Sequence, residues 1–353
     1  MRVALAISII CFHSVVTSYG ATAQSALDDS TLGPFIELLV PMFFSLSGFL
    51  VAGSLERTRT VISFLGLRGL RIFPALCAEI FLSAFVLGTV FTVLPWRTYF
   101  SSPELWGYLN NVHGGIPDGI HYYLPGVFVH NPISKVNGQL WTVPGEIYCY
   151  LALTAIFVVG LVRRRWAFLA LFSLAQIYFL WRGYTIPSSF GFQVPSNQLV
   201  MCFLAGVLLF LFRDYAPWNG RFGVAAMVVS IAVLLLLRNG GFVDPVPIAY
   251  MTVYLGLMNP RKIWLLETGD YSYGLYLYGY PIQQAVSACS PSFRHWWINI
   301  LIALPLAFGF AALSWHCLEK RVLRHKKSIY ALEATIISAF AKLLPGSSVD
   351  ELR

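Results

Sequence analysis

Long apolar runs separated by short polar segments dominate the chain. Several runs approach the roughly 20 residues that a helix needs to cross the hydrocarbon of a bilayer. A helix also satisfies its own backbone hydrogen bonds there. The pattern therefore predicts an all-α, polytopic integral membrane protein. Run lengths and helix breakers predict ten transmembrane helices, at residues 2–19, 34–54, 73–94, 141–162, 166–181, 197–212, 222–237, 245–258, 271–289 and 296–317.

Positive charges between these runs are distributed unevenly. Alternate loops and the C-terminal tail carry most of the lysines and arginines, among them Arg57, Arg59, Arg68, Arg71, Arg163, Arg164, Arg165, Arg213, Arg221, Arg261 and Lys262. The other loops have only Arg97, Lys135, Arg182, Arg238 and Arg294. Because positive loops stay on the cytoplasmic side, both termini are expected to be cytoplasmic.

Composition supports this interpretation and excludes others. The chain is 57% hydrophobic and only 11% charged, against about 25% charged in soluble domains. The net charge of +8 is divided among short clusters, which report topology and predict no nucleic-acid partner. The six cysteines lie in or beside apolar runs and form no C-x-x-C pair. They are expected to be buried hydrophobes, with neither disulfides nor a metal site.

Two segments fall outside the predicted helices. Residues 95–140 form the longest external stretch and show no helical period, so this stretch is a candidate cover for an acceptor site. Residues 1–325 are predicted to form one transmembrane domain. Residues 326–353 form a cytoplasmic tail, in which apolar positions recur at helical spacing. This tail is expected to contain a short amphipathic helix that lies on the inner membrane surface.

The first apolar run contains an ionisable residue, His13. Such residues in membrane spans are costly and are functional candidates, although a neutral histidine bonded to a neighbouring helix is an alternative. Arg2 precedes it by eleven residues, close to three helical turns, so the two side chains share a face about 16 Å apart along the axis. An imidazole near mid-membrane could take a proton from an attacking hydroxyl.

Arg68 and Arg71 lie three residues apart in the stretch before the third predicted span. Their spacing puts both guanidinium groups on one face of a helical turn, where they could bind the phosphates of a nucleotide-bearing acyl donor. Arginines at an inner helix end are also what topology alone predicts.

Glu146 opens the fourth predicted span, after Trp141 and before Tyr148. It is a candidate for orienting an acceptor sugar or the histidine, with the two aromatic residues as acceptor contacts. An acid in the first turn after a proline is equally favourable as helix capping. Glu37 and Glu79 are further buried acids without a predicted role.

Several segments together resemble the acyltransferase 3 family of bacterial membrane O-acyltransferases, from Arg2 to about Arg324. The resemblance rests on Arg2 with His13, Phe43 to Leu50 (FFSLSGFL), Arg68 to Ala75 (RGLRIFPA), Leu140 to Tyr148 (LWTVPGEIY), Tyr271 to Tyr278 (YSYGLYLY), and Ser314-Trp315 leading to Glu319-Lys320.

This resemblance implies an acyl-coenzyme A donor, commonly acetyl, bound at the cytoplasmic face near Arg68 and Arg71. It implies that Arg2 and His13 are required for transfer, with no tightly bound cofactor, in a multi-pass protein of the bacterial inner membrane. Two departures stand out. The family usually has a leader before its arginine, which implies a natural start upstream of Met1. Many relatives also carry a histidine near where Gly279 and Tyr280 stand here.

The combined hypothesis is that His13, as general base, helps transfer an acyl group from acyl-coenzyme A to a hydroxyl of a cell-surface or secreted glycan. Acylation of His13 itself is an open alternative. So is a lipid-linked sugar flippase that performs no acyl transfer. The first run and Ala21-Thr22-Ala23 also fit a cleavable signal peptide, which would leave nine spans.

Overall fold

The computed structural model describes the chain except residues 59, 186–193, 195, 238–239, 259–267 and 344–353. Within these described residues the fold is helical, and the only paired extended residues are Thr92 and Val127. The α-helices are α1 (Arg2–Tyr19), α2 (Ala21–Asp28), α3 (Gly33–Thr58), α4 (Val61–Leu82), α5 (Gly88–Phe91), α6 (Trp96–Ser101), α7 (Pro103–Leu109), α8 (Thr142–Val158), α9 (Arg165–Thr185), α10 (Ser196–Leu211), α11 (Gly220–Leu236), α12 (Pro245–Leu257), α14 (Ser272–Cys289), α15 (Trp296–Ser314), α16 (Lys320–Val322) and α17 (Lys326–Leu343).

Short helical segments of other types join these helices. π-Helical turns cover Ser83–Leu87 and Trp315–Glu319. The 3-10 turns are Asn110–His113, Gly138–Trp141, Leu161–Arg163, Gly240–Phe242, Pro291–Arg294 and Leu323–His325.

All ten predicted ranges fall on helices. Among the described residues, five helical stretches are long and apolar enough to cross a membrane: Arg2–Tyr19, Gly33–Thr58, Val61–Phe91, Gly138–Val158 and Trp296–Thr335. Large apolar side chains point outward, including Leu174, Leu236 and Leu301, which are 67%, 80% and 69% exposed. Apolar surface of this kind is suited to lipid, and it indicates a membrane protein. How many helices cross the membrane, and in which direction, stays a prediction.

The third predicted span begins too late in the sequence. Helix α4 starts at Val61 instead of residue 73, so Arg68 and Arg71 belong to the helix and not to a preceding loop. Both guanidinium groups line an internal cavity, which accommodates charged residues in a helix that hydropathy alone would begin only after them.

The stretch at 95–140 contains α6, α7, the 3-10 turn Asn110–His113 and the start of the 3-10 turn Gly138–Trp141, which the sequence did not predict. A buried polar cluster fixes it to α4, because Asn137 donates a hydrogen bond to Glu79 at 2.8 Å and also contacts the Tyr108 hydroxyl. Ser83 adds a hydrogen bond to the same carboxylate at 2.5 Å. Glu79 therefore has a structural role as an acceptor that ties this segment to the helix.

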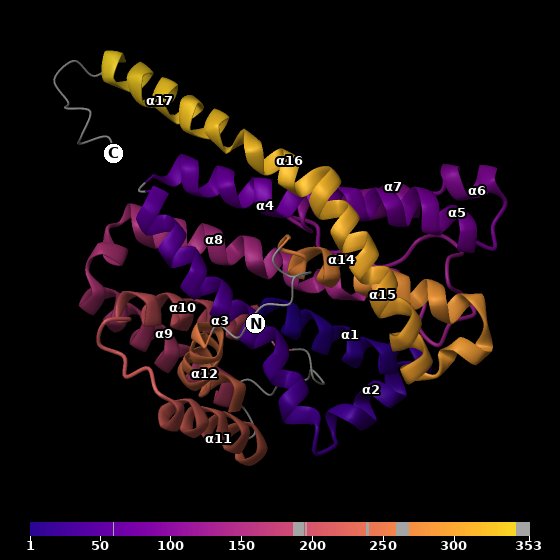
Figure 1. The fold of residues 1–353 in the computed structure, drawn as a ribbon, viewed down its shortest axis with the longest axis horizontal. Helices are drawn as coiled ribbons and strands as arrows, with labels where there is room; N and C mark the ends of the chain where they lie inside the picture. The colour runs from indigo at the N-terminus through magenta and orange to yellow at the C-terminus, as the bar shows by residue number, and fades with distance from the viewer. Residues whose placement is uncertain (59, 186–193, 195, 238–239, 259–267, 344–353) are drawn as a thin grey trace.

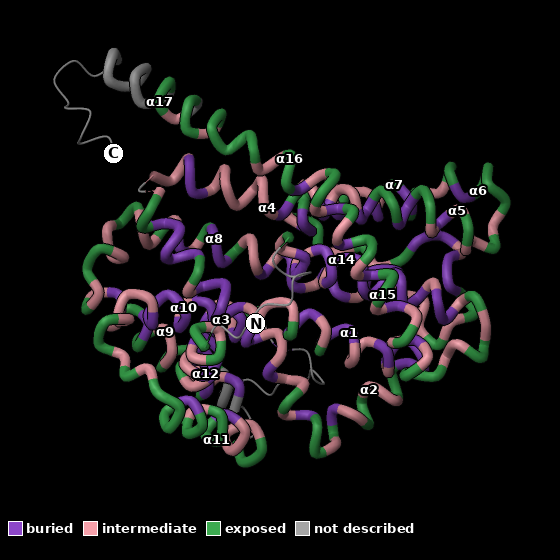
Figure 2. The backbone as a smooth tube through the Cα atoms, viewed as in Figure 1, coloured by how far each residue is buried: buried purple, intermediate pink, exposed green. Residues whose placement is uncertain are grey.

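Helices α9 to α12 gather on one side of the molecule, and α14 and α15 lie on the other (Figure 1). Helix α1 packs against α3, α14 and α15, and Gln283 of α14 donates a hydrogen bond to the carbonyl oxygen of Ile10 at 2.7 Å. Figure 2 shows buried residues along α10 and α14, whereas α11 and the described part of α17 are largely exposed. Helix α1 is therefore packed inside the helical bundle.

The tail helix α17 begins at Lys326, at the predicted domain boundary. It packs on the start of α4, where Ile329 lies against Gly66 and Ser63 donates a hydrogen bond to Glu333. Its predicted attachment to the membrane surface stays a prediction.

Candidate active site

A cavity of about 80 Å³ lies between α1, α3, α4, α8 and α14; we call it the arginine cavity. Its charged lining comes from Arg2, Arg68, Arg71 and Glu146, and Ser47 is among its polar residues. The predicted arginine pair of α4 and the arginine of α1 therefore meet at one cavity, although Arg2 and Arg68 are 66 positions apart in sequence.

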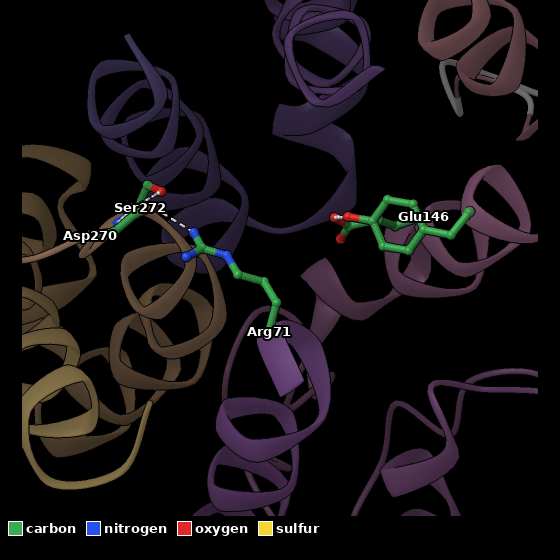
Figure 3. A network of polar contacts seen from close by, with 5 residues as sticks. Arg71, Glu146, Asp270 and Ser272 are labelled. Carbon is green, nitrogen blue, oxygen red and sulfur yellow. Dashed lines mark hydrogen bonds and ion pairs between the residues drawn. The ribbon is translucent and has the colours of Figure 1, made fainter. Parts of the chain in front are cut away.

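Each arginine of α4 is held by one neighbouring element. Arg68 donates a hydrogen bond to the Ser54 hydroxyl of α3 at 3.0 Å. Arg71 forms an ion pair with Asp270, directly before α14, at 2.5 Å, and Asp270 also accepts a hydrogen bond from the Ser272 hydroxyl at 2.7 Å. Figure 3 shows Arg71 reaching toward Asp270, with Glu146 approaching from α8 on the opposite side. Glu146 accepts a hydrogen bond from Tyr150.

Three donor atoms in the arginine cavity have no acceptor. Arg2 Nε, Arg68 Nε and Ser47 Oγ are buried, and none bonds to any residue that the structure describes. Buried donors without partners cost free energy, and charge-assisted bonds from guanidinium to phosphate are among the strongest available. The cavity is therefore chemically suited to an anionic or carbonyl-bearing ligand.

A second cavity, of about 140 Å³, lies further along α1; we call it the histidine cavity. It is lined by His13, Asp28, Glu37, Lys135, Trp141 and Tyr280. The His13 ring packs edge-on against Tyr280, with ring centroids 5.0 Å apart. Its nitrogens form no hydrogen bond within the described parts of the chain, so they are available to a bound molecule.

Asp28 adds an unusual acid to the histidine cavity. Burial raises the pKa of its carboxyl group from 3.8 to about 6, with a further contribution from the negative charge of Asp29. A carboxyl group with such a pKa can donate as well as accept a hydrogen bond near neutral pH.

The two cavities share a wall. Ile9, Val40 and Tyr276 line both of them. Two hydrogen bonds fix the Tyr276 hydroxyl: one of 2.6 Å with the Thr142 hydroxyl, and one of 2.8 Å that it donates to the carbonyl oxygen of Gln139. Arg2 and His13, which share one face of α1, thus line opposite sides of this wall.

The predicted acceptor residues are divided by the structure. Trp141 lines the histidine cavity, Glu146 lines the arginine cavity, and Tyr148 is 48% exposed and lines neither. Helical geometry explains the division, since Glu146 and Tyr148 are two residues apart on α8 and so point to different sides.

Asp270, Tyr276 and Tyr280 were not predicted as site residues. Tyr276 lies within the segment Tyr271 to Tyr278 on which the family resemblance rests, and the sequence marks Tyr280 only as a position near which many relatives carry a histidine. Tyr276 and Tyr280 are four residues apart, so they share the face of α14 that meets α1. That spacing is the signal that could have indicated them.

Asp270 gives the site a measurable pH dependence. Burial alone would raise the pKa of this carboxyl group, but Arg71 and then Arg2 outweigh it, and the pKa falls from 3.8 to about 2. The ionised form therefore stabilises the fold fully above pH 3.8, and this contribution is lost as the pH falls toward 2. Asp270→Asn should lower the melting temperature in detergent at pH 6, and the gap from the native chain should narrow at pH 3. An unchanged gap would show that the ion pair contributes no pH dependence.

The chain has recognisable relatives. A family model described as an acyltransferase domain matches residues 1–318. The chain belongs to this acyltransferase family. Among the relatives of this acyltransferase is the O-acetyl transferase of Shigella phage Sf6, which is 25% identical over 305 residues, covering 84% of this chain and 87% of the relative. Another is nodulation protein 10 of Rhizobium leguminosarum bv. viciae, 26% identical over 332 residues, with coverages of 84% and 85%. No solved structure matches the acyltransferase significantly.

Proposed function

We propose that this acyltransferase moves an acyl group, most simply acetyl, from acyl-coenzyme A to a hydroxyl of a glycan, with His13 as general base. The observation that supports the proposal is the pair of cavities with a common wall. One offers three arginines, and the other offers an imidazole without a hydrogen-bond partner among the described residues.

The arginine cavity is the proposed donor side. Arg68 and Arg71 bind the diphosphate of acyl-coenzyme A, and Arg2 with Ser47 directs buried donors at the acyl-bearing arm. Asp270 must share Arg71 with that diphosphate, because the ion pair occupies one of its nitrogens. By the charge of the loops, this side faces the cytoplasm.

The histidine cavity is the proposed acceptor side. Trp141 and Tyr280 present aromatic surfaces, while Asp28 and Glu37 present carboxyl groups. Aromatic faces suit the apolar faces of sugar rings, and carboxyl groups suit their hydroxyls. This combination supports a saccharide acceptor.

The transfer balances with the residues present. The acceptor oxygen attacks the thioester carbonyl carbon while its proton moves to a ring nitrogen of His13. The carbon–sulfur bond then breaks, the acyl–oxygen bond is complete, and the thiolate takes the proton back from the imidazolium to leave as free thiol. The wall of Ile9, Val40 and Tyr276 limits the entry of water, which would otherwise hydrolyse the thioester.

A direct assay tests this function. Purified protein in vesicles is incubated with acetyl-labelled acetyl-coenzyme A and candidate oligosaccharides, and both free thiol and labelled saccharide are measured. Equal amounts of the two products support the proposal. Movement of a labelled lipid-linked sugar across the vesicle without thiol release would instead identify a flippase.

Tyr276 offers a separate prediction about the wall. Tyr276→Ala should open the wall between the two cavities, so that water reaches the thioester. Several moles of thiol should then be released per mole of acyl group transferred. Tyr276→Phe keeps the ring and loses only the bonds to Thr142 and Gln139, so its ratio should stay near one. Measurement of both products decides the matter, and a ratio near one for the alanine variant would contradict a role as a wall.

A further inference from the structure

A third cavity, of about 1120 Å³, lies at the ends of α3, α8 and α10, beside α17; we call it the terminal groove. Arg163, Arg165 and Arg213 line it, together with Phe157, Phe210 and Tyr330. The function proposed above does not use this groove.

The groove and the arginine cavity lie along the same two helices, although they share no lining residue. On α8, Tyr150 lines the arginine cavity and Phe157 lines the groove; on α10, Phe203 and Phe210 do the same. Both pairs are seven residues apart, so each pair lies on nearly one helical face about 10 Å apart. The groove therefore lies about two turns beyond Tyr150 and Phe203, on the side away from the histidine cavity.

Two of its arginines stack on aromatic rings and form no ion pair with the described residues. The Arg163 guanidinium lies over the Phe157 ring at 5.5 Å, and that of Arg165 over Tyr215 at 4.5 Å. Neither forms an ion pair with any carboxylate in the described ranges. Stacking on a ring leaves the edge N–H groups of a guanidinium available to a phosphate.

Three acids also line the groove and equal the three arginines in number, but none of them forms an ion pair with Arg163 or Arg165 in the described ranges. Glu56 pairs with Arg213 at 3.5 Å, and Glu333 accepts a hydrogen bond from Ser63. Asp214 is the third acid. Arg163 and Arg165 therefore remain as phosphate-binding groups, beside the exposed ring of Tyr330.

We infer that the terminal groove binds the adenosine 3′-phosphate end of the acyl-coenzyme A donor. This inference rests on the proposed function. When the diphosphate lies at Arg68 and Arg71, the nucleoside and its 3′-phosphate extend away from His13. The terminal groove lies in that direction. Arg163 and Arg165 bind the 3′-phosphate, and the aromatic lining stacks on the adenine.

The test compares acetyl-coenzyme A with acetyl-3′-dephospho-coenzyme A. The native chain should have a KM about ten-fold or more higher for the dephospho donor. Arg163→Gln and Arg165→Gln should raise the KM for acetyl-coenzyme A and leave that for the dephospho donor nearly unchanged, so the ratio of the two moves toward one. Arg221→Gln is the matched control, because this exposed arginine at the start of α11 lies outside the groove and should keep the native ratio.

Other outcomes would overturn the inference. Equal KM values for both donors in the native chain would show that the 3′-phosphate is not recognised. A variant that raises both KM values equally, in a way that depends on anionic lipid in the vesicle, would show that the arginines bind a lipid headgroup instead.

Binding measurements separate this inference from the proposed function. Titration calorimetry measures the Kd of the native chain for coenzyme A and for 3′-dephospho-coenzyme A. It depends neither on acyl transfer nor on the correct folding of a substituted protein. A ten-fold difference in Kd without any acyl transfer would support the groove while contradicting the proposed reaction. Equal Kd values would overturn the groove even if transfer occurs.

Discussion

Replacing His13 by glutamine should lower kcat for acyl transfer by about a hundred-fold or more, since general-base catalysis contributes about 10²–10⁴-fold. Glutamine keeps a polar side chain against Tyr280 but cannot accept a proton from the acceptor hydroxyl. The affinity for coenzyme A should stay unchanged, because His13 lines only the histidine cavity. Steady-state kinetics and calorimetry on one preparation measure the two quantities.

His295→Gln is the control for this substitution, because that histidine stacks on Trp297 and lines neither the histidine nor the arginine cavity. It should retain native kcat. Native rates of both thiol release and glycan labelling in the His13 variant would refute its role as the base. Terminal sequencing of the same preparation should find Arg2 and His13 in the mature protein; a chain starting at Gln24 would lack both.

Substituting Gly48 by alanine should prevent the formation of a stable fold. A Cβ atom on Gly48 would lie 2.0 Å from the carbonyl oxygen of Phe203, and one on Gly206 would lie 2.0 Å from that of Ser45. The backbones of α3 and α10 thus touch at two glycines, as small residues allow between membrane helices. Overpacking costs about 1–3 kcal/mol or more, and here the obstacle is backbone that cannot rotate away.

The measurement is the yield of monodisperse protein in detergent, together with its melting temperature. Gly309→Ala on α15 is the matched control, because no heavy atom lies within 4 Å of an added Cβ there. It should behave like the native chain. A Gly48 variant with native yield and melting temperature would show that α3 and α10 can separate at little cost.

The sequence predicted the positions of the long helices well, because the length and hydropathy of an apolar run identify a membrane helix. It also predicted correctly that Arg2 and His13 share a face of α1, which follows from helical periodicity alone. Gly48 illustrates the limit of prediction from sequence. The motif that contains it was recognised, but the need for glycine there comes from contact with the backbone of α10, and that contact depends on which helices pair. Local patterns do not encode that pairing.

The candidate site was predicted only in part for the same reason. Glu146 joins the arginines and Trp141 does not, because the 3-10 turn Gly138–Trp141 lies beside the histidine cavity and α8 begins beside the arginine cavity. Asp270 reaches Arg71 across 199 positions of sequence. Hydropathy began the third span only after Arg71, at residue 73, because it assigns water or lipid around every residue and has no term for an internal cavity that accommodates charge.

The wall formed by Ile9, Val40 and Tyr276 has a consequence for a membrane that maintains ion gradients. In the proposed orientation, one substrate arrives from each compartment and neither has to cross. Only the acyl group, which is small and uncharged, changes sides. Modification of extracellular sugars with an intracellular metabolite would then proceed without dissipating the gradients on which the cell depends.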